Sequence, residues 1–79
     1  MSDRSATLQS ARNQAGLTVA ELWLRYFGLG GMSTPLEVDG VLYGALTPTD
    51  LDYDLLAHAI NERFLELGGD HPVPYSESP

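Results

Sequence analysis

The sequence predicts an all-α fold, a small three-helix bundle, on three observations. Helix-start signals occur at Thr18, Thr34 and Thr47. Glycines and short connectors lie between the segments that follow them, as between helices that turn back onto one another. Apolar residues recur at helical spacing in the segments. We therefore expect three helices, over about 18–28, 35–44 and 48–67.

The first predicted helix contains the segment T-V-A-E-L-W-L-R-Y-F, residues 18–27. Thr18 and Glu21 have the spacing of a capping box, which satisfies two free amides at a helix start. Only Glu21 and Arg25 are left to face water, as an acid-then-base pair spaced i, i+4. A helix that is apolar on most sides is the centre of a small bundle or is completed by a second protein.

The other two helices are predicted to begin at proline. Residues 34–37, T-P-L-E, repeat the capping box with proline at the first helical position. Residues 47–50, T-P-T-D, start the third helix with aspartate in place of glutamate. This longest helix ends at about Leu67, because Gly68 and Gly69 follow it. Its main apolar face consists of Tyr53, Leu56, Ile60, Phe64 and Leu67.

The two ends of the chain are predicted to differ from the helical domain. Leu8 is the only large apolar residue between Met1 and Leu17, too little burial to offset the entropy of ordering the segment. Val73 and Tyr75 are placed to strap across the bundle. The predicted organisation is a flexible arm over 1–16, a helical domain over 17–75 and a loose tail over 76–79.

The charge of the chain is strongly acidic. It has 79 residues, eleven Asp and Glu, four Arg and no Lys, for a net charge of −7. Such a surface repels phosphates, so we expect no direct contact with nucleic acid. It favours a basic protein partner, such as the nucleic-acid-binding face of another protein.

The composition also narrows the compartment and the chemistry. Cysteine is absent, which excludes disulfides and thiolate chemistry. No apolar run approaches the roughly 18 residues of a membrane span, and the start of the chain lacks the pattern of a signal peptide. We expect a cytoplasmic protein that does not contact membranes and is not an enzyme. No catalytic residue and no cofactor is predicted.

The predicted function is that of a regulatory or adaptor module that binds another protein, either a basic one or a second copy. The first two helices carry more apolar side chain than three helices can cover. Acidic residues at the start of the third helix would steer a basic partner. The predicted partner-binding residues are Trp23, Leu24, Val38, Leu42, Asp50 and Asp54.

Two other kinds of site are considered on the helices. A helix-turn-helix would use residues 34–43 to read DNA, but this segment offers Glu37 and Asp39 and no Arg, Lys, Asn or Gln. DNA binding is therefore a further alternative. Asp54 and His58 have a spacing that can bind a metal, but a stable site needs three or four ligands, so no metal site is predicted.

The stretch F-G-L-G-G-M-S, Phe27 to Ser33, resembles the F-x-L-G-G-x-S of acyl and peptidyl carrier proteins. In that family the serine starts a helix and carries a phosphopantetheine arm. The resemblance implies an alternative function, a carrier domain modified at Ser33. The surrounding sequence departs from the family, because the helix runs straight into the glycines and Pro35 follows the serine closely.

A longer pattern consists of L-W-L-R-Y-F-G-L-G-G-x-x-x-P-L-E-V from Leu22 to Val38 and L-A-H-A-I-N-E-R-F from Leu56 to Phe64. This pattern resembles short acidic proteins of actinobacteria. Those proteins are uncharacterised and regarded as regulatory. The resemblance implies a regulatory role and brings no site residues.

Overall fold

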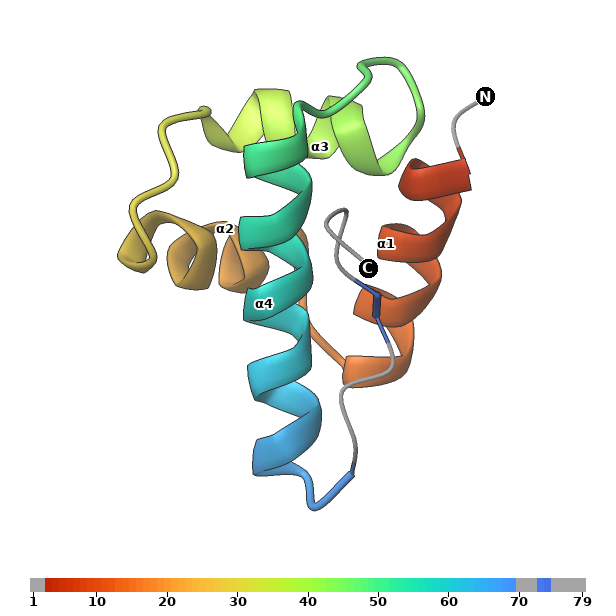
Figure 1. Cartoon of the computed structure of the whole chain (residues 1–79), viewed down its shortest axis with the longest axis vertical. Helices are drawn as coiled ribbons and strands as arrows, with labels where there is room; N and C mark the ends of the chain where they lie inside the picture. Colours follow the sequence, from red (N-terminus) through yellow and green to blue (C-terminus); the bar gives the residue numbers. More distant parts are fainter. Residues whose placement is uncertain (1–2, 70–72, 75–79) are drawn as a thin grey trace.

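The computed structural model describes residues 3–69 and 73–74 and has four α-helices where three were predicted (Figure 1). In chain order they are α1 (Asp3–Ala15), α2 (Val19–Gly28), α3 (Pro35–Leu42) and α4 (Asp50–Glu66). The described residues contain no β-strand, so the all-α class is confirmed. The predicted count of three is wrong because the N-terminal segment is also a helix.

The segment 1–16, expected to be a flexible arm, forms α1 from Asp3 onward and contributes to the core. Leu8 is fully buried, and Ala11 and Ala15 on the same face are also buried. α1 packs on both α4 and α3. The expectation failed because it weighed only large apolar side chains. A narrow stripe of leucine and alanine is enough here, since alanine is the strongest helix former and adds little bulk between helices.

The predicted starts of α2 and α3 are confirmed, and the predicted start of α4 is wrong by two residues. In both α2 and α3 a threonine hydroxyl accepts from a glutamate N–H, and the glutamate carboxylate accepts from the threonine N–H. The two capping boxes are Thr18–Glu21 and Thr34–Glu37. α4 begins at Asp50, two residues later than predicted, with Thr49 as its N-cap. Local sequence therefore determines where α2 and α3 begin.

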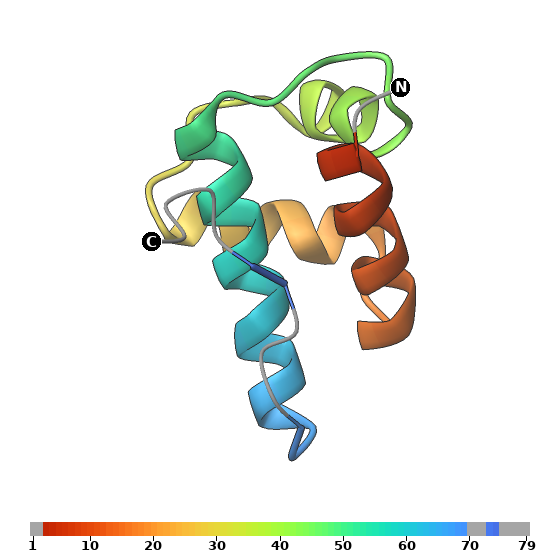
Figure 2. The same cartoon turned by 45° about the vertical axis from the view of Figure 1, so that its right-hand side comes forward.

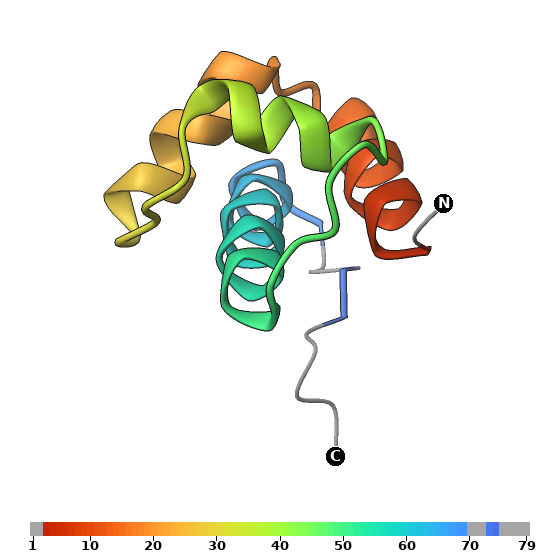
Figure 3. The same ribbon diagram turned by 90° about the horizontal axis from the view of Figure 1, so that it is seen from above.

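α4 is the central helix of the molecule. It packs against α1 on one side and against α2 on another, while α3 packs against α1 and α2. α2 and α3 run in opposite directions on the same side of α4, as Figures 2 and 3 show. All four helices contribute to one core, whose fully buried large side chains include Leu8, Leu22, Tyr26, Val38, Leu56 and Ile60.

The predicted strap across the bundle is present at Val73. This residue is buried, and it lines a hollow together with residues of α1. The buried amide of Asn61 accepts from the Val73 N–H at 3.1 Å and donates to its carbonyl at 2.9 Å. The Tyr53 hydroxyl donates to the Pro74 carbonyl at 2.8 Å. Tyr75 and the predicted loose tail lie outside the described residues.

Candidate functional site

Ser33, in the connector between α2 and α3, is bound through each of its three polar groups. Its N–H donates to the Tyr26 hydroxyl at 2.8 Å, and its carbonyl accepts from Trp23 Nε1 at 2.9 Å. Its hydroxyl donates to Asp52 Oδ2 at 2.9 Å. Asp52 Oδ1 accepts from the Tyr26 hydroxyl at 2.7 Å. These four residues, the Ser33 network, fasten the connector to the first turn of α4.

Gly31 allows the connector to lie against α2. A Cβ at this position would overlap the ring of Tyr26, which is fully buried. Gly31 and Ser33 therefore have a packing role in this stretch. A phosphopantetheine arm on Ser33 Oγ would replace the hydrogen bond to Asp52. The carrier alternative has no supporting feature in this geometry.

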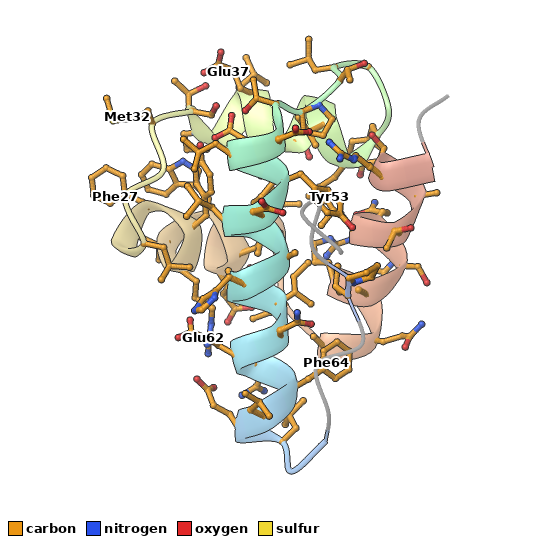
Figure 4. The ribbon with its side chains drawn as sticks, in the orientation of Figure 1. Phe27, Met32, Glu37, Tyr53, Glu62 and Phe64 are labelled. Carbon is orange, nitrogen blue, oxygen red and sulfur yellow. The ribbon has the colours of Figure 1, made fainter. Side chains whose placement is uncertain are left out.

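Beside the Ser33 network, four large apolar side chains point into solvent. Leu24 is 61% exposed and Phe27 59%, both on α2, while Met32 in the connector is 91% exposed and Leu36 on α3 is 80% exposed. We call this set the apolar corner. Phe27 and Met32 project from the same outer side of the molecule (Figure 4). Phe27 also stacks on the half-buried ring of Trp23, with centroids 5.0 Å apart.

The helical period explains why α2 has two apolar faces. Leu22 and Tyr26 lie one turn apart and are both buried in the core. Leu24 and Phe27 lie on the other side of the same helix and remain exposed. Because α2 is flanked by α4 and α3, its outer face has no described element over it.

The structure divides the predicted apolar contact residues. Leu24 is exposed and Trp23 half-buried, next to one another on α2. Val38 is 1% and Leu42 3% exposed, so the expectation that they form a contact surface is wrong. α1, which the prediction left out of the core, packs against α3 and supplies the missing cover. Phe27, Met32 and Leu36 were not among the predicted contact residues.

The predicted acidic rim lies at the start of α4. Asp50 is well exposed and accepts from Arg4 Nη1 at 2.6 Å. This hydrogen bond raises the pKa of Arg4, whose guanidinium also lies 4.8 Å from the centroid of the Tyr53 ring. Asp54 is half-buried one turn along the helix. The rim is therefore present, and α1 already supplies one cation to it.

The other arginines also form internal bonds. Arg25 does not pair with Glu21 as predicted, and instead donates two hydrogen bonds of 2.8 Å to Glu66 on α4. These bonds lower the pKa of Glu66 to about 2. Arg12 donates to the Leu17 carbonyl at 2.6 Å. Arg63 Nε donates to the Ala15 carbonyl at 3.4 Å. All four arginines of the chain thus have partners within it.

The titratable side chains and the hollows of the described structure give little support for a metal site or a catalytic site. His58 Nε2 lies 3.6 Å from Glu62 Oε2, and within 3–69 and 73–74 no three His, Asp or Glu side chains are grouped to hold a metal ion. Two hollows of about 420 Å³ flank α1. Among the residues that the structure describes, those that line the two hollows include no carboxylate, histidine or arginine.

In the part of the chain that the structure describes, no helix has the length and apolarity needed to cross a bilayer. No protein-family model, curated protein or solved structure matches the chain.

Proposed function

We propose that this chain is a non-enzymatic regulatory or adaptor module that binds another protein through the apolar corner. The observation that carries the proposal is the exposure of Leu24, Phe27, Met32 and Leu36 in one short stretch of the fold. Single exposed apolar residues are normal on a protein surface. Neighbouring ones that include an aromatic side chain are typical of contact sites for other proteins.

The Ser33 network supports the proposal because it holds the corner in one shape. Met32 precedes Ser33 directly, and Trp23 carries the ring on which Phe27 stacks. The hydrogen bonds of Ser33 with Trp23, Tyr26 and Asp52 limit the conformations of the connector. A surface that is already ordered loses less entropy when a partner binds.

The other classes of function have weaker support. α3 carries Glu37 and Asp39 and no basic residue, which disfavours contact with DNA phosphates. Among the described residues that line the hollows beside α1, none is a carboxylate or a histidine that could act as a general base. A gain in intact mass after incubation with coenzyme A and a phosphopantetheinyl transferase would assign Ser33 to the carrier function instead.

The test uses the full chain as bait in the cell of origin, followed by calorimetry with the purified partner. We expect Leu24→Gln and Phe27→Gln each to weaken binding by about tenfold or more, the loss expected at a hot spot. Leu65→Gln and Leu67→Gln are matched controls, because these residues at the end of α4 are 56% and 54% exposed. They should bind as the wild type does. Equal binding by corner and control variants would overturn the proposal.

A further inference from the structure

Three of the four residues of the apolar corner, Phe27, Met32 and Leu36, lie in a part of the chain that has no basic side chain; the fourth, Leu24, precedes Arg25, which binds Glu66. Residues 26–62 include the end of α2, the connector, α3 and most of α4, and contain neither Lys nor Arg. They contain six carboxylates, which are Glu37, Asp39, Asp50, Asp52, Asp54 and Glu62. We call residues 26–62 the acidic span.

Internal ion pairs do little to offset this charge. Arg4 reaches into the acidic span and binds Asp50. The other three arginines make their hydrogen bonds outside it, with Arg25 on Glu66 and Arg63 on the Ala15 carbonyl. Glu37 is exposed beside Leu36, and Asp39 is half-buried two residues further along α3. The corner is thus bordered by negative charge on α3.

We infer that the apolar corner accepts an amphipathic basic segment of another protein. This inference rests on the proposed function and adds the chemistry of the partner. Apolar side chains of the segment would cover Phe27, Met32 and Leu36, and its Arg or Lys side chains would meet Glu37 and Asp39. The exposed ring of Phe27 also offers an arginine a face for a cation–π contact.

A second copy of this chain fits the corner less well than a basic segment. Each copy carries a net charge of −7. A symmetric contact through the corner would bring two acidic α3 surfaces together, and like charges repel one another over a Debye length of roughly 8 Å at physiological salt. The acidic span contains no Lys or Arg to place between them.

The closing experiment uses the full chain and two synthetic peptides. Both are amphipathic helices of roughly 18 residues, or five turns, with the same leucine face; one has arginine on its polar face and the other glutamine. Trp23 is the only tryptophan of the chain and stacks on Phe27, so its fluorescence reports contact at the corner. We expect the arginine peptide to bind at least about tenfold more tightly, with an affinity that falls as salt is raised.

Charge variants locate the contact. Glu37→Gln with Asp39→Asn should weaken binding of the arginine peptide about fivefold or more, while Glu21→Gln should not. Glutamine keeps the capping box at positions 21 and 37, so helix starts are preserved in both variants. Phe27→Gln should weaken binding, whereas Leu65→Gln should leave it unchanged.

The outcomes separate this inference from the proposed function. If both peptides bind with equal affinity, or if salt does not change the affinity, the inference of a basic partner is wrong. The proposal that the corner binds a protein is then unaffected. Sedimentation showing a dimer that Phe27→Gln dissociates would assign the corner to a second copy and overturn the inference. If the natural partner binds the corner variants as tightly as the wild type, the proposed function is wrong, irrespective of how the peptides bind.

Discussion

Arg25 on α2 donates two hydrogen bonds, each of 2.8 Å, to the carboxylate of Glu66 at the end of α4. This bidentate contact joins residues 41 positions apart and ties the end of the central helix to its neighbour. Both side chains are partly exposed, so salt and water weaken the pair. The contact also gives the protein a defined response to acid.

Glu66→Gln should remove the acid-dependent part of this contact. The pKa of Glu66 is about 2, below its ordinary value of 4.5. Its contribution to stability is therefore complete above pH 4.5 and is lost as the pH falls through 2. Urea unfolding should show the wild type as more stable than Glu66→Gln at pH 7, with the difference vanishing toward pH 2. In an Arg25→Gln background the same change should have a smaller effect, because only the 3.5 Å contact with Arg63 then remains to Glu66; a pH-independent difference would contradict the assignment.

Removing the hydroxyl of Tyr26 should destabilise the fold through the Ser33 network. Tyr26→Phe leaves the Ser33 N–H and one oxygen of Asp52 without their present partner. We expect a loss of about 1–3 kcal/mol in the free energy of unfolding, the cost of unpaired groups away from water. Trp23 fluorescence during urea unfolding measures it. Ser10→Ala removes an exposed hydroxyl of α1 and should cost less than about 0.5 kcal/mol. Equal effects of the two changes would count against the network.

Gly31→Ala should be harmful where Gly28→Ala is not. The new Cβ at position 31 would overlap the Tyr26 ring, whereas at position 28 nothing lies within 4 Å. Because Tyr26 is fully buried, its ring cannot move without disturbing the core. We expect Gly31→Ala to lower the free energy of unfolding by about 1–3 kcal/mol. Thermal unfolding of both variants checks this, and a neutral Gly31→Ala would mean that the connector does not pack as described.

Leu8→Ala tests whether α1 belongs to the core. Leu8 is fully buried, so its truncation should cost about 2–5 kcal/mol. Ala6→Ser, on the exposed side of the same helix, should cost less than about 0.5 kcal/mol. Chemical denaturation followed by circular dichroism measures both. If the N-terminal segment were a free arm, both substitutions would be neutral.

Helix starts and helix faces could be predicted from sequence because their causes are local. A threonine and a glutamate three residues apart complete a capping box without any other part of the chain. The exposure of Leu24 also has a local cause, because this residue lies on the side of α2 opposite to Leu22 and Tyr26. The exposure of Leu24 was therefore predictable from the sequence.

The candidate site was only partly predictable for the opposite reason. Val38 and Leu42 are covered by contacts that depend on α1, and α1 looked too polar to pack. The hydroxyl of Ser33 donates a hydrogen bond to Asp52, 19 residues further along the chain, and no local sequence pattern predicts such a pair. Met32 is exposed because the connector folds back on Tyr26 and leaves it outside.

By itself, then, the sequence determined an acidic all-α chain, the capped starts of α2 and α3 and the apolar character of α2 on both faces. Only the tertiary structure decided which apolar side chains are covered and which partner each charge takes. Arg25 illustrates the reason: Glu21 lies one turn away, yet the side chain binds Glu66. Glu21 already accepts the Thr18 N–H, and the packing of α4 brings a second carboxylate within reach.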